Sequence, residues 1–442
     1  MESILIKTAQ LLLSLSILVV LHEFGHFMFA RLFNTRVEKF YLFFNPWFSL
    51  FKVQKGETEY GIGWLPLGGY VKIAGMIDES MDKEAMKLPP QPYEFRAKPS
   101  WQRLLIMLGG IVMNFIFAIL IYIGVLYAWG SQYLPTENVK HGIVVSETGK
   151  AIGFETGDKI LTVDGEYIEN FNKIVPIIVL DNAKSVQVER NGQKVDVEIT
   201  NADLALLLKS RDVMGPRMPF DFQIGKLIKE SQAVLAGLLK GDKVIGINGQ
   251  TFDYYDEFTE YLTSQKNKSI QIDIIRDGNA KSLPIITDED GKIGFYPQFA
   301  ESAIPEYATI KYGFFESFPA GINRGVETTK DYLKQFKLFF KPETKAYESL
   351  GGFITIGNIF PGIWDWYSFW NMTAFISIIL AIMNLLPIPA LDGGHVMFTL
   401  YEMISGRKPN EKFLEYAQVG GMILLLALVL YANANDIIKL FY

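Results

Sequence analysis

Two histidines and a glutamate stand close together near the start of the chain, in the pentapeptide His-Glu-Phe-Gly-His at residues 22–26. Positions i and i+4 share one face of a helix, so His22 and His26 would present two ring nitrogens to the same zinc ion. Glu23 between them is placed to act as general base on a water that this ion activates. The alternative is that both histidines are buried and hydrogen-bonded to neighbouring helices.

The surroundings of this motif are apolar. Residues 8–21 carry no charge, and the stretch from 4 to 33 is long enough to cross a bilayer as a helix. Two imidazoles and a carboxylate are costly in hydrocarbon, so a cluster of them in such a segment indicates a functional site. The sequence therefore predicts a metal site inside the membrane.

A catalytic zinc site usually has three protein ligands, so the two histidines need a partner. Asp392 is the preferred candidate, in the segment Asn-Leu-Leu-Pro-Ile-Pro-Ala-Leu-Asp-Gly-Gly-His at residues 384–395. Its apolar segment and the first one run in the same direction across the membrane, which places Asp392 and His22 at similar depth. His395 is a competing ligand. A helix-terminal aspartate in contact with lipid headgroups is the alternative for Asp392. The two prolines must interrupt the helix here and free backbone groups that a polar cavity or packed protein has to satisfy.

Composition supports a membrane protein of several parts. The 442 residues are 49% hydrophobic and 20% charged, with long uncharged runs that soluble proteins rarely contain. The net charge of −6 gives no indication of a nucleic-acid partner. The chain has no cysteine, so any zinc must be held by histidine and carboxylate. The start of the chain lacks a basic region and a cleavage site, so the first apolar segment is expected to remain as an anchor.

Four segments are long and apolar enough to span a bilayer, at residues 4–33, 104–129, 369–391 and 416–432. Lysine and arginine gather at both ends of the 31–103 stretch and in the short connection between the third and fourth segments. The positive-inside rule therefore predicts that these two loops are cytoplasmic. Both termini and the large 130–368 region are then extracytoplasmic.

The outer region contains an internal repeat. The segment from Gly153 to Gly165 recurs as Gly237 to Gly249, each with a central Gly-Asp-Lys and a terminal Asp-Gly or Asn-Gly. A strand-like segment ending in Arg-Asn-Gly or Arg-Asp-Gly follows each copy, which is typical of tight hairpins. The copies resemble bacterial PDZ domains, which bind extended peptides by adding a strand to a sheet edge. Spacer domains without ligands are the alternative. After the second copy, residues 306–342 predict an amphipathic helix, and Trp364, Trp366 and Trp370 an interfacial belt.

On these residues the chain resembles the site-2 protease family, and within it the bacterial RseP-type proteases that regulate sigma-E. The resemblance covers essentially the whole chain and rests on residues 22–26, 65–73, 109–115 and 384–394 together with the two repeats. It implies an intramembrane zinc metalloprotease with Zn²⁺ as cofactor. His22, His26 and Asp392 would hold the metal, and Glu23 would be the catalytic base.

The resemblance also implies residues that hold the substrate. Read alone, the glycine-rich stretch that ends in residues 65–73 predicts a hairpin; by resemblance it is a re-entrant β-loop whose strand edge pairs with an unwound substrate helix. Asn384 would stabilise substrate backbone or the transition state. Gly110 and Asn114 are read as a helix-packing pair. The residues implied for substrate binding are Gly68, Gly69, Tyr70, Val71, Asn384, Pro387 and Pro389.

The expected fold is a multi-pass α-helical membrane protein with four transmembrane helices and two β-rich PDZ-like extracytoplasmic domains. The expected divisions are 1–34, the first span with the histidine motif; 35–100, a cytoplasmic loop with the re-entrant β-loop; 101–130, the second span; 131–214 and 215–300, the PDZ-like domains; 301–368, an amphipathic helical connector; 369–395, the third span with Asp392; and 396–442, a cytoplasmic loop and the fourth span.

The expected function is cleavage of transmembrane segments of single-pass membrane proteins, such as anti-sigma factors or remnant signal peptides, in regulated intramembrane proteolysis. Membrane lipid and peptide or protein ligands of the PDZ-like domains are the other expected partners, in a bacterial inner membrane. Two other classes stay open. A PDZ-containing scaffold with a non-catalytic metal site is disfavoured because a structural zinc site needs no base such as Glu23. A metal transporter is disfavoured because the four spans show no inverted repeat.

Overall fold

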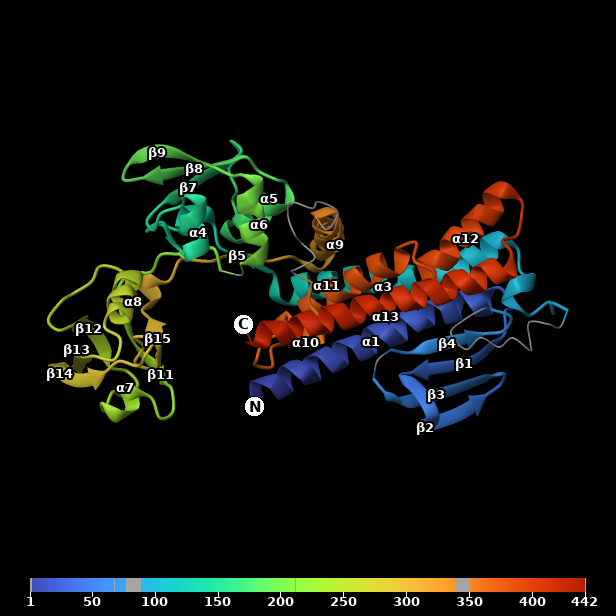
Figure 1. Ribbon diagram of the computed structural model, residues 1–442, viewed down its shortest axis with the longest axis horizontal. Helices are drawn as coiled ribbons and strands as arrows, with labels where there is room; N and C mark the ends of the chain where they lie inside the picture. The colour runs from blue at the N-terminus through green and yellow to red at the C-terminus, as the bar shows by residue number, and fades with distance from the viewer. Residues whose placement is uncertain (1, 67, 77–88, 211, 339–349, 442) are drawn as a thin grey trace. The chain divides into compact units, whose positions relative to one another are not determined.

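The computed structural model describes residues 2–66, 68–76, 89–210, 212–338 and 350–441. It divides into two compact units (Figure 1). The first unit comprises residues 1–131, 311–337 and 347–442 and contains the long helices. The second unit comprises residues 132–310 and 338–346 and is rich in β-strands.

Among its described residues, the first unit has four helices that are long and apolar enough to cross a membrane. They are α1 (Glu2–Leu32), α3 (Ser100–Trp129), α11 (Trp366–Leu385) and α13 (Glu411–Phe441). Their positions agree with the four segments expected from the sequence. The start of α1 and the end of α13 lie at the same end of this unit (Figure 1), where both contact the segment around α10 (Phe353–Gly357).

The third apolar segment is shorter as a helix than expected. The sequence suggested a span up to residue 391, but α11 ends at Leu385. Leu386 is extended, with φ −60° and ψ 143°, because the residue before a proline is driven out of the helical region. A six-residue loop, 386–391, then leads into α12 (Asp392–Ser405). Asp392 is therefore the first residue of a new helix.

Glycines allow α1 and α3 to meet backbone to backbone. A methyl group added at Gly25 would overlap the carbonyl oxygen of Gly109, and one added at Gly109 would lie 2.5 Å from the carbonyl oxygen of Gly25. Close approach through small residues is a common way to pack membrane helices, because lipid provides no hydrophobic force between them. α11 packs on α3 as well, and Ser377 donates a hydrogen bond to the backbone carbonyl of Asn114 at 2.8 Å.

A four-stranded sheet follows α1 and contacts it through β1 and β4. Its strands are β1 (Val37–Leu42), β2 (Phe44–Lys55), β3 (Thr58–Leu65) and β4 (Tyr70–Ile73), in the order β2-β3-β1-β4. The expected hairpin through residues 65–73 is wrong: β3 and β4 do not pair, because β1 lies between them, parallel to β3 and antiparallel to β4. The hairpin joins β2 and β3 instead, and β4 is an edge strand. Leu67 of this stretch lies outside the described residues.

The helix expected between residues 306 and 342 is α9 (Phe314–Leu338), and residues 339–342 lie outside the described part of the chain. A short strand, β16 (Ala308–Ile310), precedes α9 and pairs with β5 (Ser131–Tyr133). Gly321 and Gly325 bring α9 against Ile123 and Ile119 of α3.

The second unit contains two modules with the same order of elements, except that the first has an additional helix, α6, before its last strand. The first has β6 (Ile143–Val145), α4 (Glu147–Ile152), β7 (Lys159–Val163), α5 (Ile174–Leu180), β8 (Ser185–Arg190), β9 (Gln193–Glu198), α6 (Asn201–Lys209) and β10 (Met214–Pro216). The second has β11 (Phe222–Leu227), α7 (Gln232–Leu235), β12 (Lys243–Ile247), α8 (Tyr255–Ser264), β13 (Ser269–Arg276), β14 (Asn279–Ile286) and β15 (Phe295–Phe299). In each module the last strand pairs antiparallel with the first. Short 3₁₀ turns lie at Phe95–Ala97, Thr136–Asn138, Phe171–Lys173 and Glu301–Ala303.

The repeated sequence forms the same buried ion pair in both modules. Arg190 at the end of β8 donates to Asp158 from Nε and Nη2, both at 2.8 Å, and to the carbonyl of Gly153. Arg276 at the end of β13 donates to Asp242 at 2.6 and 2.5 Å, and to the carbonyl of Gly237. Each aspartate is almost fully buried. The internal repeat is therefore also a repeat of three-dimensional structure.

Candidate active site

The two histidines of the pentapeptide lie side by side on α1. They are one helical turn apart, and their Nε2 atoms are 3.3 Å from each other. Gly110 of α3 faces both rings: a methyl group there would lie 2.5 Å from Nε2 of His26 and 2.6 Å from Cε1 of His22. The rings therefore occupy the space that a side chain on α3 would otherwise fill.

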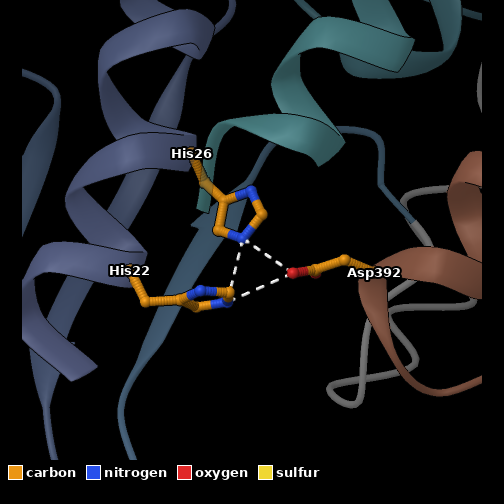
Figure 2. A group of neighbouring side chains, drawn as sticks. All are labelled: His22, His26 and Asp392. Atoms are coloured by element: carbon orange, nitrogen blue, oxygen red, sulfur yellow. Dashed lines mark hydrogen bonds and ion pairs between the residues drawn. The ribbon is translucent and has the colours of Figure 1, made fainter. Parts of the chain in front are cut away.

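Asp392 completes the cluster from the other end of the chain. Its Oδ2 atom lies 3.1 Å from Nε2 of His22 and 3.3 Å from Nε2 of His26 (Figure 2). Within the described residues these three form a group whose donor atoms all lie close enough to hold one metal ion. The loop 386–391 makes this possible, because it turns the chain so that the start of α12 faces α1.

The three donor atoms fit zinc. Tetrahedral Zn²⁺ with bonds of about 2.0–2.1 Å places neighbouring ligand atoms about 3.3 Å apart, close to the 3.1, 3.3 and 3.3 Å between these atoms. Oδ2 of Asp392 is buried and has no hydrogen-bond partner among the described residues. A buried carboxylate oxygen left in this way is costly unless a cation or donor satisfies it. The site suits a metal with two imidazoles and one carboxylate as ligands.

The other ring nitrogens of the histidines are held by α3. Nδ1 of His26 lies 2.8 Å from the carbonyl oxygen of Ile106, which can only accept and so fixes a proton on Nδ1. Nδ1 of His22 lies 3.4 Å from the side-chain amide of Asn114, whose Oδ1 is buried without a partner. Exchanging the amide oxygen and nitrogen of Asn114 would let Oδ1 accept the His22 proton and leave Nε2 of both rings free for a metal.

This contact changes the interpretation of Asn114. The sequence reading treated Gly110 and Asn114 as a helix-packing pair, but Asn114 contacts a candidate ligand directly. Sequence reasoning also missed the Ile106 carbonyl. The signal for Asn114 was available in its spacing: it follows Gly110 by four residues, and positions i and i+4 share one face of a helix. A backbone carbonyl such as that of Ile106 leaves no signal in the sequence.

Glu23 faces a pocket that the edge strand β4 helps to form. The pocket is lined by His22, Glu23, His26, Phe44, Gly69, Tyr70, Val71, Lys72, Ile73, Met76, Met107 and Asp392. The Glu23 carboxylate lies near the backbone amide of Val71, and a methyl group added at Gly69 would lie 3.7 Å from Cγ of Glu23. Glu23, the three candidate metal ligands and the edge strand β4 therefore share one cavity.

Of the other residues expected to bind substrate, some lie at the metal cluster or the pocket and others do not. The side-chain nitrogen of Asn384 lies 3.4 Å from Nε2 of His22, so Asn384 reaches the metal cluster. Gly68 is next to Phe44, a lining residue. Pro387 and Pro389 are not among the residues that line this pocket. Pro389 packs on glycines of α12 and α13 instead, because the two prolines shape the loop that ends α11.

His395, the competing ligand, lies outside the cluster. It follows Asp392 on α12 and lines a separate pocket with residues that include Met76, Arg103 and Glu402. The structure therefore brings Asp392, and not His395, to the histidine pair.

Comparison with known proteins places this site in a family. The model of peptidase family M50 matches residues 10–428. The chain is 29% identical to a regulator of sigma E protease of Haemophilus influenzae over 99% of this chain and 100% of the relative. It is 30% identical to protease RseP of Yersinia pestis over the full length of both chains. A putative zinc metalloprotease of Pasteurella multocida is 28% identical over 99% of this chain. The chain therefore belongs to peptidase family M50, the site-2 protease family, and is a zinc metalloprotease of the RseP type.

Proposed function

We propose that this protease is an intramembrane endopeptidase that cleaves transmembrane segments of single-pass membrane proteins in regulated intramembrane proteolysis. Anti-sigma factors and remnant signal peptides are the substrate types we infer. One observation carries the proposal: both histidines of the metal cluster and Glu23 belong to the long apolar helix α1, and they line one pocket with the edge strand β4. Only a substrate that lies in the same membrane reaches such a site directly.

His22, His26 and Asp392 would hold the zinc ion, which supplies Lewis-acid activation of the scissile carbonyl and of the attacking water when bound. Glu23 takes the proton of that water and delivers it to the leaving amine. The side-chain nitrogen of Asn384 lies 3.4 Å from Nε2 of His22, and it donates a hydrogen bond to the substrate carbonyl beside the metal cluster. The catalytic roles of Glu23 and Asn384 are part of the proposal.

Edge strand β4 presents the substrate backbone to these groups. A transmembrane helix hides its peptide bonds in internal hydrogen bonds, so cleavage requires local unwinding. Gly69, Tyr70 and Val71 line the pocket, and among the described strands β4 pairs with β1 alone, so its other side is a sheet edge. An unwound substrate segment pairs with this edge as an added strand, which satisfies its exposed backbone groups and aligns a peptide bond with the cluster.

The surface of the β2–β3 hairpin supports a membrane location for the sheet. Trp47 is 90% exposed, and its neighbours Phe48, Leu50 and Phe51 are all more than half exposed. An apolar patch of this kind marks contact with lipid or protein. We infer that it lies among lipid acyl chains, as a re-entrant β-loop does, and that it holds β4 at the depth of the metal cluster.

The location that we propose is a bacterial inner membrane, with the two β-rich modules and both termini on the periplasmic side. The support is the gathering of basic residues in the 31–103 loop and between α12 and α13. We further propose that the modules are PDZ-like domains with peptide or protein ligands. Their repeated order of strands, with the last strand returning to the first, supports that proposal.

Membership of a peptidase family decides among the three classes that the sequence left open. Neither a scaffold with a non-catalytic metal site nor a metal transporter needs a general base beside the metal ligands. A hydrolase does, and Glu23 is placed for that role.

The test is a Glu23→Gln variant, reconstituted in liposomes with a single-pass reporter that carries an anti-sigma-factor transmembrane segment. We expect the variant to retain zinc and to lose cleavage by a factor of about 10²–10⁴, the usual contribution of a general base. It should also capture uncleaved substrate in a membrane pull-down. Glu57→Gln is the matched control and should cleave normally, because Glu57 is an exposed glutamate in the turn between β2 and β3. A zinc-loaded Glu23→Gln protein that cleaves the reporter at the normal rate would contradict the proposal.

A further inference from the structure

The loop 386–391 between α11 and α12 is packed against glycines on two helices. On α12, a methyl group at Gly394 would lie 2.7 Å from Cα and 2.9 Å from N of Pro389, and one at Gly393 would overlap the carbonyl of Leu386. On α13, a methyl group at Gly421 would overlap the carbonyl oxygen of Pro389. The Pro389 peptide is therefore enclosed between α12 and α13.

Gly421 differs sharply from its neighbour Gly420. Gly421 is buried, and an added methyl would meet the Pro389 carbonyl group and lie 3.2 Å from Pro389 Cα. Gly420 is exposed, and an added methyl would meet nothing within 4 Å. Both lie inside α13, where alanine is intrinsically the better helix former by about 1 kcal/mol. The contact with Pro389 gives a reason for glycine at position 421 that does not apply at position 420.

The enclosed loop also contains a strained residue. Ala390, directly after Pro389, has φ of +107°, a conformation that residues with a side chain rarely adopt. Such a conformation costs on the order of 1–3 kcal/mol and persists only where the surroundings enforce it. Asp392 follows two residues later and is the first residue of α12. The packing of Pro389 and the direction of Asp392 are thus joined by one short, strained stretch of backbone.

α13 is anchored on both sides of this contact. Toward its start, Phe413 packs edge-to-face on Phe398 of α12, with ring centroids 6.0 Å apart. Toward its end, Asp436 accepts hydrogen bonds from the amide and the hydroxyl of Thr355 at 3.0 and 2.5 Å. The intervening side chains Leu426 and Leu430 are 58% and 71% exposed and have the character of a lipid-facing surface. α13 is thus held in place on both sides of its contact with the loop 386–391.

We infer that Gly421 is a positioning residue for Asp392. Gly421 of α13 packs against the Pro389 carbonyl, and this contact keeps Ala390 at positive φ. The backbone at Ala390 in turn fixes the direction in which Asp392 faces the two histidines. The inference rests on the proposed role of Asp392 as a metal ligand. α13 therefore helps to set the geometry of the metal ligands, although it supplies no ligand among the described residues.

The experiment compares zinc affinity in Gly421→Ala, Gly420→Ala and Asp392→Ala, each as the full chain purified in detergent and titrated against a chromophoric chelator. Residues that orient a ligand typically contribute 10–100-fold to metal affinity. We expect Gly421→Ala to bind zinc about tenfold or more weakly and to change the visible absorption of the Co²⁺-substituted protein. Gly420→Ala should match the wild type in both measurements.

The outcomes separate the inference from the proposed function. If Gly421→Ala retains wild-type zinc affinity and Co²⁺ spectrum while Asp392→Ala loses zinc, the positioning role is wrong and the metal site stands. If Asp392→Ala also retains zinc, the proposed metal site itself is wrong.

A second measurement does not depend on the folding of Gly421→Ala. The chain has no native cysteine, so Gly420→Cys and Leu430→Cys can each carry a single spin label. Coupling between two sites is reciprocal, so zinc binding must restrict α13 near its contact with Pro389. We expect removal of zinc to change the label mobility at position 420 more than at position 430. Equal spectra with and without zinc at position 420 would overturn the inference.

Discussion

The carboxylate of Glu23 lies beside the backbone amide of Val71. Residue 23 belongs to the histidine pentapeptide of α1, and residue 71 to the edge strand β4. The strand proposed to receive substrate therefore touches the proposed base, and the position of the base depends on that strand.

Removal of the Val71 amide should slow cleavage without loss of the metal. A Val71→Pro change deletes the amide that we expect to donate to the ionised Glu23, and a hydrogen bond to a charged group is worth about 1.5–3 kcal/mol. We expect kcat to fall by about 10- to 100-fold, while zinc stoichiometry stays unchanged. Val71→Ala, which keeps the amide, is the control and should cleave nearly normally. Loss of the same activity in Val71→Ala would assign the effect to the side chain.

Asp392 and His395 should respond differently to substitution. Asp392 lies 3.1 and 3.3 Å from the two histidines, and His395 lines a different pocket. We expect Asp392→Asn to lose most zinc and all detectable cleavage, because a neutral amide is a poor zinc ligand. His395→Asn should retain zinc. Metal analysis of the purified proteins measures both, and zinc loss in His395→Asn alone would reverse the assignment.

Asn114 should contribute to zinc affinity although it is not a ligand. Its side-chain amide contacts Nδ1 of His22, and partners of this kind typically contribute 10–100-fold to metal affinity. We expect the chelator concentration that removes zinc from Asn114→Ala to be about tenfold lower than the concentration that removes it from the wild type. Asn371→Ala is the matched control: Asn371 is also buried in a long helix, but it bonds to the carbonyl of Tyr367. Equal chelator sensitivity of the two variants would show that Asn114 only packs.

The second β-rich module should lose stability in acid. Burial by itself raises the pKa of Asp242, but the hydrogen bonds from Arg276 and from the Leu239 amide, with the Arg276 charge, outweigh it and hold the pKa below its ordinary value. A lowered carboxyl pKa contributes stability above the ordinary value of about 3.9, and this contribution is lost as the pH falls through the folded-state pKa. Hydrogen exchange of β12 and β13 in the full chain, corrected for intrinsic rates, should therefore accelerate below about pH 4.

The same ion pair offers a paired test of the repeat. Arg276→Met leaves Asp242 buried without its partner, which costs about 3 kcal/mol. We expect faster hydrogen exchange in residues 222–299 and little change in residues 143–216. Arg190→Met should produce the reverse pattern, because Arg190 holds Asp158 in the first module. Acceleration of both modules by either variant would show that they unfold as one cooperative unit.

Local spacing explains how much of the site the sequence could predict. The spacing of His22 and His26 is sufficient to place both on one helix face, because helix geometry is local. The repeated Gly-Asp-Lys segments likewise predicted two similar modules, since the same turn and strand residues form the same hairpins. Membrane depth favoured Asp392 as the third ligand over His395, and the family match to zinc metalloproteases agrees with a metal site.

The remaining features depend on contacts between residues far apart in the chain. The strand order β2-β3-β1-β4 arises because β1 pairs with both β3 and β4, which no local turn signal reveals. The choice of Asp392 over His395 follows from the direction in which a two-proline loop enters α12. The contacts of Asn114 with His22 and of Gly421 with Pro389 join different helices. The sequence by itself thus determined the pentapeptide, the apolar spans and the repeat. Only the tertiary structure decided which distant side chains and backbone groups hold the metal ligands in place, because close packing between helices sets those contacts.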